Sequence, residues 1–300
     1  KEVKVIVFPS GNYISFQGGS NYIGYKTNML LQREGAVMQS FAFNDDYVYI
    51  TQQQAGAGAA FSKIKIDSVT NLLGEGQKFK NNVAIIRDTG HAANIDIEVA
   101  DDGTYLWTSC STDSADVAYH CRIPLKSVQF GNAIVQEQNY NIKVSGSNSI
   151  SVDEKNRTIV VMTGSKRYHK FSVYNLDDYI NSARNGTKAI ALSSFSIDKK
   201  DSKYHRQGFS VYGNYIYDYE GNYTNEKDST GNPVPYDIFL SVYTLDGKEV
   251  VGRTKINYPD ENYYWEPEGI QIYNNKIYIG MGRIEKKSNP RKTANIYVLK

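Results

Sequence analysis

A unit of two alternating strands joined by a tight turn occurs five times in this sequence. The clearest copy is WEPEGIQIYNNKIYIGM at 265–281, where an Asn-Asn pair separates the two alternating runs. Asparagine tolerates the positive φ of a two-residue turn, so this pair predicts a hairpin. Each unit opens with a polar residue, and these five residues are spaced 52 to 61 positions apart: Gln39, Asp96, Asn148, Gln207 and Glu268.

A third strand follows each hairpin, as in FSKIKI and DIFLSVYTL. Antiparallel repeats of this length are typical of propeller blades. We therefore predict an all-β fold, a five-bladed β-propeller formed by one domain over residues 1–300. A two-layer sandwich is the alternative, and five copies in register argue against it. The predicted blades span 37–80, 81–134, 135–191, 192–253 and 254–300.

The N-terminal region holds further alternating segments, VKVIVF, NYISF and NMLLQ. Propellers often close the ring with a terminal strand that leaves no free edge. We expect one of these segments to pair with the last blade, which begins near Glu268. The one helical signal is NLDDYINSAR, with Asn175 in the N-cap position and acidic residues in the first turn.

Composition excludes several function classes. The formal net charge is +2, from 34 basic and 32 acidic residues, so no basic footprint for nucleic acid is present. No run of about eighteen apolar residues predicts a membrane span. No secretory signal is seen, although a chain that begins at Lys1 leaves room for a removed leader.

The two cysteines, Cys110 and Cys121, lie in one predicted blade. A cross-strand disulfide between them would indicate an extracellular setting, and two buried thiols are the equal alternative. The sequence has no CxxC spacing, so we predict no metal site, and no cofactor motif is present.

Equivalent positions converge on one ring in a radial array. If the first strand of each unit is innermost, its opening polar residue lies at one mouth of the central channel. There it could hydrogen-bond to hydroxyls or hold a cation, or it could cap the channel and satisfy buried backbone. The loops before these strands add His, Arg, Trp and Glu side chains on the same face, where propeller ligands usually bind. The candidate ligand-binding residues are Gln39, His91, Asn94, Asp96, His205, Arg206, Gln207, Tyr264, Trp265, Glu266 and Glu268.

Four segments carry a resemblance to a known family: MQSFAFNDDYVYITQQ, GHAANIDIEV, RQGFSVYGNYIYDYEGN and EPEGIQIYNNKIYIG. They resemble the propeller shared by helveticin J-type bacteriocins, TagC-like cell-envelope proteins and receptor-binding proteins of phages of Gram-positive bacteria. The resemblance covers residues 20–300. It implies recognition of cell-wall glycopolymers such as teichoic acid, through Gln39, His91, Asn94, Asp96, Gln207 and Glu268. Ala92 and Ala93 stand where relatives often have a Gly-containing pair.

The resulting expectation is a secreted, extracellular, bacteriocin-like protein that binds a Gram-positive wall glycopolymer without chemistry of its own. Tyr264 and Trp265 would stack on sugar rings, and His205 and Arg206 would meet phosphate. One alternative is a phage receptor-binding propeller on the virion tail. Another is a hydrolase or lyase that uses Asp96, Glu266 and Glu268 as paired carboxylates. A protein–protein platform is a third.

Overall fold

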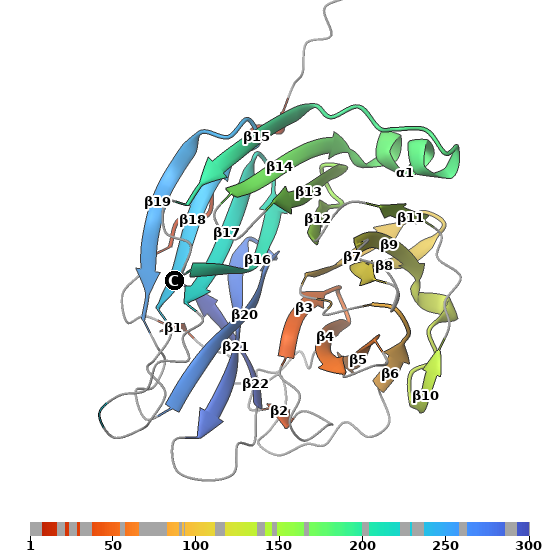
Figure 1. The fold of residues 1–300 in the computed structure, drawn as a ribbon, viewed down its shortest axis with the longest axis horizontal. Helices are drawn as coiled ribbons and strands as arrows, with labels where there is room; N and C mark the ends of the chain where they lie inside the picture. Colours follow the sequence, from red (N-terminus) through yellow and green to blue (C-terminus); the bar gives the residue numbers. More distant parts are fainter. Residues whose placement is uncertain are drawn as a thin grey trace, which may run out of the picture.

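Five sheets surround a central axis in the computed structural model of the chain (Figure 1). The residues that the structure describes are 8–16, 22–23, 29–30, 38–54, 58–65, 83–89, 92, 94–111, 118–136, 142–145, 149–164, 168–199, 204–222, 229, 237–257, 263–285 and 293–299.

The innermost strand of each sheet is the first strand of each sequence repeat. These strands are β3 (Met38–Phe43), β7 (Ile95–Ala100), β12 (Ser149–Asp153), β16 (Tyr204–Tyr212) and β20 (Tyr263–Tyr273). Each lies against the next, and β20 lies against β3, so the ring is closed. This arrangement confirms the five-bladed propeller, because a two-layer sandwich has no such ring.

The outer strands complete each blade in order. Blade 1 adds β4 (Tyr47–Gln54), β5 (Gly58–Lys65), β6 (Val83–Ile86) and β10 (Asn132–Gln136), and blade 2 adds β8 (Gly103–Ser111), β9 (Ala118–Pro124) and β11 (Ile142–Ser145). Blade 3 adds β13 (Thr158–Gly164), β14 (Tyr168–Asn175) and β15 (Ser193–Asp198), blade 4 adds β17 (Tyr215–Asn222), β18 (Ile238–Thr244) and β19 (Glu249–Ile256), and blade 5 adds β21 (Lys276–Glu285) and β22 (Thr293–Leu299).

The blades end later in the sequence than we predicted. The fourth strands β6, β11 and β15 lie beyond the predicted limits at 80, 134 and 191. These outer strands have 4, 4 and 6 residues. The predicted units contained only three strands each, so the sequence pattern ended a blade at its third strand. A 3₁₀ turn, η1 (Leu125–Ser127), follows β9.

Two N-terminal strands close the ring, as expected. β1 (Tyr22–Ile23) and β2 (Met29–Leu30) pair antiparallel with β22, placing Tyr22 opposite Leu299 and Met29 opposite Ala294. They cover the outer edge of the last blade. The VKVIVF segment lies outside the described residues except for Phe8.

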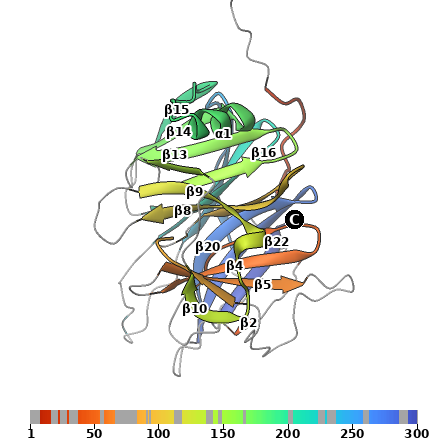
Figure 2. The ribbon, with the colours of Figure 1, turned by 90° about the vertical axis from the view of Figure 1, so that its right-hand side faces the viewer.

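The predicted Asn-Asn turn and the predicted helix start are both confirmed. Asn274 and Asn275 have φ of 48° and 57° and make the β20–β21 turn. The helix α1 (Leu176–Arg184) begins after Asn175, whose side chain accepts a 3.0 Å hydrogen bond from the Asp178 N–H. Figure 2 shows α1 beside the strands of blade 3.

Five apolar clusters make the core, and each fills one interface between neighbouring blades. Trp107 packs between blades 2 and 3, and Trp265 packs between blades 4 and 5. Burying one large apolar side chain contributes about 1.5–3 kcal/mol, so these clusters hold the blades in a fixed ring. Among the described residues, no helix is long and apolar enough to cross a membrane.

Candidate functional site

β-bulges interrupt three innermost strands at the residues that open the sequence repeats. The pairing register skips between Met38 and Ser40, between Arg206 and Gly208, and between Pro267 and Ile270. The displaced residues therefore include Gln39, Gln207 and Glu268. A bulge re-aims the side chain of the extra residue, which is why bulges occur beside functional sites. Gln39 and Gln207 are half-buried, whereas Glu268 is only 5% exposed.

Asn94 ties three blades together at the centre of the ring. Its Nδ2 donates to the carbonyls of Ile150 and Phe209, the latter at 3.2 Å, and its Oδ1 accepts from the Phe209 N–H at 3.2 Å. Asn94 is 1% exposed. These hydrogen bonds pair buried backbone groups of the neighbouring blades. Asn94 therefore has the capping role that the sequence analysis gave as the alternative to ligand binding.

The innermost strands also touch one another at two glycines. A Cβ on Gly208 would lie 3.1 Å from the Cα of Gly269, and a Cβ on Gly269 would lie 3.0 Å from the Cα of Ser40. Gly269 has φ of 87°, a conformation that favours glycine. The innermost strands therefore approach one another closely at the level of Asn94.

Asp96 lies next to this close approach and also serves the packing of the blades. Its Oδ2 accepts a 2.7 Å hydrogen bond from the Val152 N–H of blade 3. Gln271 of blade 5 donates to the Ile95 carbonyl at 2.7 Å and hydrogen-bonds Asp96 as well. Burial raises the pKa of Asp96 to about 7, although these hydrogen bonds oppose the change.

One predicted ligand contact, Trp265, is packed between blades instead, and a second, Arg206, is half-buried and reaches across to blade 3. Trp265 is 2% exposed and meets the ring of Tyr297 edge-on at 5.9 Å, so it is a core residue and not a sugar platform. The Arg206 guanidinium donates from Nη2 to the Ser149 hydroxyl at 2.6 Å, and burial lowers its pKa to about 10. The buried position of Trp265 differs from the expected one because β20 begins at Tyr263, earlier than the sequence indicated, and its alternation turns the indole inward.

Some of the remaining candidates stay at the strand-start end of the ring. His205 and Glu266 are half-buried in β16 and β20. The backbone of Tyr264 pairs with Ile284, and its side chain lies outside the described residues, as does all of His91.

Cys110 and Cys121 are buried thiols in the structure and form no disulfide with each other. Their strands pair so that Cys110 faces Tyr119 and Cys121 faces Thr108. The two cysteines are therefore diagonal neighbours. Diagonal Cβ atoms lie too far apart for the roughly 3.8 Å that a disulfide requires. The candidate disulfide is replaced by the buried-thiol alternative.

A cavity that the sequence analysis missed opens at the other end of the channel, beside the hairpin turns. We call it the hairpin cavity. Its volume is about 700 Å³, and all five blades line it, through residues 43–45, Asp96, Ile97, Val99, 152–155, 210–212 and 271–275. The sequence signal that could have indicated this cavity is the set of polar turns after the inner strands, and we interpreted these residues only as turns.

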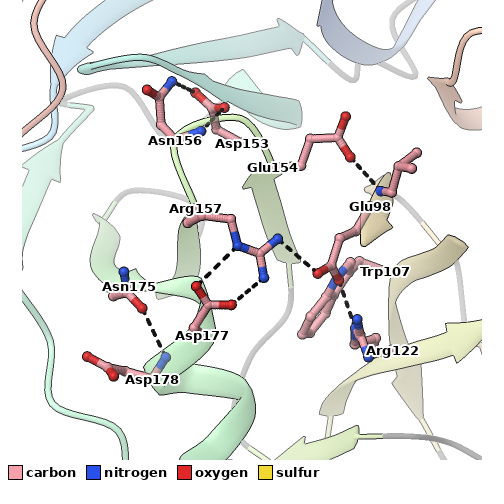
Figure 3. Close-up of polar contacts among 11 residues, drawn as sticks. Glu98, Trp107, Arg122, Asp153, Glu154, Asn156, Arg157, Asn175, Asp177 and Asp178 are labelled. Carbon is pink, nitrogen blue, oxygen red and sulfur yellow. Dashed lines mark hydrogen bonds and ion pairs between the residues drawn. The ribbon is translucent and has the colours of Figure 1, made fainter. Parts of the chain in front are cut away.

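Two smaller hollows of about 350 and 450 Å³ flank the β7–β8 hairpin on the same end. Beneath the larger one, buried Glu98 accepts from Arg122 Nε at 2.7 Å and from Arg157 Nη1 at 3.2 Å (Figure 3). The indole of Trp107 donates to the same carboxylate at 2.8 Å. Arg157 also pairs with Asp177 of α1, so the network clamps blade 2 to blade 3.

One buried group in blades 3 and 4 has metal-ligand chemistry. Ligand atoms of His169, Asp218 and Glu220 lie within 4.8 Å of one another. The Lys199 ammonium is 2.6 Å from Asp218 and 3.3 Å from Glu220. It occupies the position of a counter-cation, so this cluster is a buried ion network rather than a metal centre.

The sequence matches one known family. Residues 37–280 match the family described as the phage 5-bladed β-propeller receptor-binding platform domain. A comparison with curated proteins gives no match.

Solved structures share the fold at low sequence identity. The tail fiber of Staphylococcus aureus phage P68 superposes with a TM-score of 0.60 at 16% identity, over 93% of this chain and 52% of that one. This chain thus spans about half of the tail fiber. The GH43 endo-arabinanase from Bacillus licheniformis gives a TM-score of 0.51 at 13% identity, over 90% of this chain and 96% of that one. The exo-β-1,3-galactanase from Phanerochaete chrysosporium gives 0.52 at 12%, over 93% and 64%.

Proposed function

Because the chain belongs to the family of phage 5-bladed β-propeller receptor-binding platform domains, we propose that it attaches a virion tail to the surface of its bacterial host. The family match over residues 37–280 is the observation that carries this proposal. It favours the phage alternative over the secreted bacteriocin that we expected first, because the matched family is described as a phage receptor-binding domain.

The proposed receptor is a glycopolymer of a Gram-positive cell wall, such as teichoic acid. Glycans offer many hydroxyl groups, and amides are suitable partners because they both donate and accept hydrogen bonds. Gln39 and Gln207 are half-buried amides set on bulges at the strand-start end of the ring. His205 lies half-buried on the same strand as Gln207, β16, and Glu266 lies half-buried at the start of the neighbouring β20.

We propose binding without turnover. A glycoside hydrolase needs two carboxyl groups that flank the scissile bond and reach the sugar or a water. Asp96 and Glu268 are each 5% exposed, and Asp96 already accepts a backbone hydrogen bond from the next blade. The arabinanase and galactanase structures share the fold alone, so they do not favour hydrolysis here.

The test is attachment of the fluorescently labelled chain to intact Gram-positive cells. We expect saturable attachment that soluble teichoic acid competes away, with no loss of viable cells. The variants Gln39→Ala and Gln207→Ala should each weaken attachment several-fold, whereas Asn185→Ala on an exposed turn should not. Cell death would restore the bacteriocin alternative, and unchanged attachment by both Gln variants would move the receptor site elsewhere on the propeller.

A further inference from the structure

We propose that the hairpin cavity is a second ligand site, for a sugar unit that carries a protonated amino group. This site lies at the mouth opposite the proposed receptor site and goes beyond the proposed function. The two sites share no side chain among the candidates named above except Asp96, which forms the floor of the cavity.

The shape of the cavity suits a small ligand. Its volume of about 700 Å³ is within the ordinary range for small-molecule sites, roughly 300–1,000 Å³. The hydrogen bonds of Asn94 and the close approach of Gly208 and Gly269 hold the innermost strands of the blades together beside it.

The charge of its lining selects a cation. Four carboxyl groups line it, from Asp45, Asp96, Asp153 and Glu154, against one ammonium, from Lys155. Because burial raises the pKa of Asp96 to about 7, that carboxyl is not counted as a charge at pH 6.5, and the acidic groups still outnumber the ammonium. Burial, followed by the nearby carboxylates of Glu98, Asp45 and Asp153, raises the pKa of Glu154. The rim of the cavity is therefore more acidic than basic. An ammonium group would be attracted there, whereas a phosphate would be repelled.

Two rim carboxylates keep an oxygen for a ligand. Glu154 uses Oε2 to accept from the Val99 N–H at 2.5 Å, as it reaches from blade 3 to blade 2 (Figure 3). Asp45 uses Oδ1 to accept from the Tyr273 hydroxyl at 3.3 Å. In the described residues, Oε1 of Glu154 and Oδ2 of Asp45 have no such partner. Both side chains are exposed at the cavity mouth.

The same rim supplies partners for the sugar itself. The ring of Tyr273 is held against Phe43 in a stacked arrangement, with centroids 5.0 Å apart and an interplanar angle of 21°. The Tyr212 hydroxyl donates to Asn275 Oδ1 at 3.4 Å, which leaves the Asn275 amide hydrogens available. Fixed aromatic rings and side-chain amides are the usual contacts of sugars in proteins.

The test is calorimetric titration of the whole chain with D-glucosamine at pH 6.5 and low salt. N-acetyl-D-glucosamine, which lacks the charge, and glucose 6-phosphate, which reverses it, are the matched probes. We expect glucosamine to bind at least about tenfold more tightly than either, because one charge-assisted hydrogen bond distinguishes them. Equal affinity for the N-acetyl sugar, or no glucosamine binding, would overturn the proposal.

Charge-neutral variants locate the binding. Glu154→Gln and Asp45→Asn keep the acceptors for Val99 and Tyr273, so both should fold, and each should weaken glucosamine binding about three- to tenfold. Asp246→Asn, an exposed carboxylate on the β18–β19 turn outside the cavity, should bind as the parent does. Unchanged affinity in both cavity variants would show that glucosamine does not bind in the hairpin cavity. If either variant misfolds, glucosamine-induced amide shifts at Asn274 and Asn275 of the parent decide the matter, and their absence overturns it. Wall attachment is a separate readout, so failure of one proposal leaves the other standing.

Discussion

Polar side chains at the centre of the ring hydrogen-bond to the backbone of neighbouring blades. Asn94 bonds the backbones of blades 3 and 4, and Asp96 bonds the backbone of blade 3. Neighbouring hydroxyls repeat the pattern, since Ser151 accepts from the Val211 N–H at 2.9 Å and Ser210 from the Ile272 N–H at 3.2 Å. These side chains replace the ladder bonds that inner strands of separate sheets cannot make to each other.

Asn94→Ala should destabilise the chain strongly. It removes three hydrogen bonds and leaves buried backbone groups of Ile150 and Phe209 without them, at about 1 kcal/mol or more for each. We expect a loss of about 3 kcal/mol in the free energy of unfolding, measured with denaturant. Gln39→Ala is the comparison at a half-buried site and should cost less than about 1 kcal/mol. Similar costs for the two variants would contradict the capping role of Asn94.

Asp96 should make stability depend on pH. Its folded pKa is raised to about 7 by burial, above the roughly 3.9 of an unfolded chain, so the folded state holds a proton that the unfolded state has released. The stability from this proton is present below the unfolded pKa and is lost as the pH rises through 7. Asp96→Asn cannot ionise and should gain about 2 kcal/mol relative to the parent between pH 5 and pH 8.

The measurement is denaturant unfolding of both proteins at the two pH values. Asp101→Asn, an exposed residue of the β7–β8 turn, is the matched control and should show no such change. A difference between Asp96→Asn and the parent that stays constant with pH would show that Asp96 is ionised throughout the range.

At the scale of elements, hairpins and the helix are joined by buried ion pairs rather than by apolar contacts alone. The Glu98 network joins β7, β8 and β9 to the β12–β13 turn and α1 (Figure 3). Breaking one partner of a buried pair leaves an uncompensated charge, which costs more than the pair contributes.

Glu98→Gln should therefore cost about 3 kcal/mol, because buried Arg122 loses its charge partner while the Trp107 hydrogen bond has a remaining acceptor. Arg122→Leu should be destabilising alone, but much less so when added to Glu98→Gln. A double-mutant cycle on the free energy of unfolding measures this coupling, which we expect to exceed about 1 kcal/mol. Additive effects would show that the two charges do not interact.

The sequence predicted elements better than it predicted the directions of side chains. Alternation and turn residues located the five hairpins, and Asn175 located the helix start. The bulges at Gln39, Gln207 and Glu268 have no pattern in an isolated sequence, since one extra residue reverses the face that follows. Trp265 lies before the bulge of its strand, and it was expected on a surface that it does not reach because β20 begins earlier than the sequence indicated. The hairpin cavity is lined by residues of all five blades, which are distant in the sequence, so only the closed ring brings them together.

At the scale of the molecule, the N-terminal region holds the ring shut. β1 and β2 pair with β22, the Tyr215 hydroxyl donates to the Gly11 carbonyl at 3.0 Å, and the Ile14 N–H donates to the Tyr217 hydroxyl at 2.7 Å. The first and last parts of the sequence thus form one blade edge. Without them, β22 would present an unpaired edge, which invites aggregation.

Deleting residues 1–36 should lower the melting temperature by at least about 5 °C and increase aggregation, since it removes both closing strands. Deleting only residues 1–7, which precede the contacts above, is the matched control and should change it by less than half as much. Thermal unfolding with light scattering measures both. Equal melting temperatures for the two deletions would show that β1 and β2 do not support the ring.

The most direct test of the account is sedimentation of the chain with purified Gram-positive cell walls, before and after their teichoic acid is stripped, with released fragments assayed in the same tubes. A receptor-binding propeller without turnover predicts binding to intact walls, loss of binding on stripping and no release of sugar fragments. Release of fragments would establish the hydrolase alternative. Absence of binding to any wall would contradict the proposed function and direct attention to a protein partner.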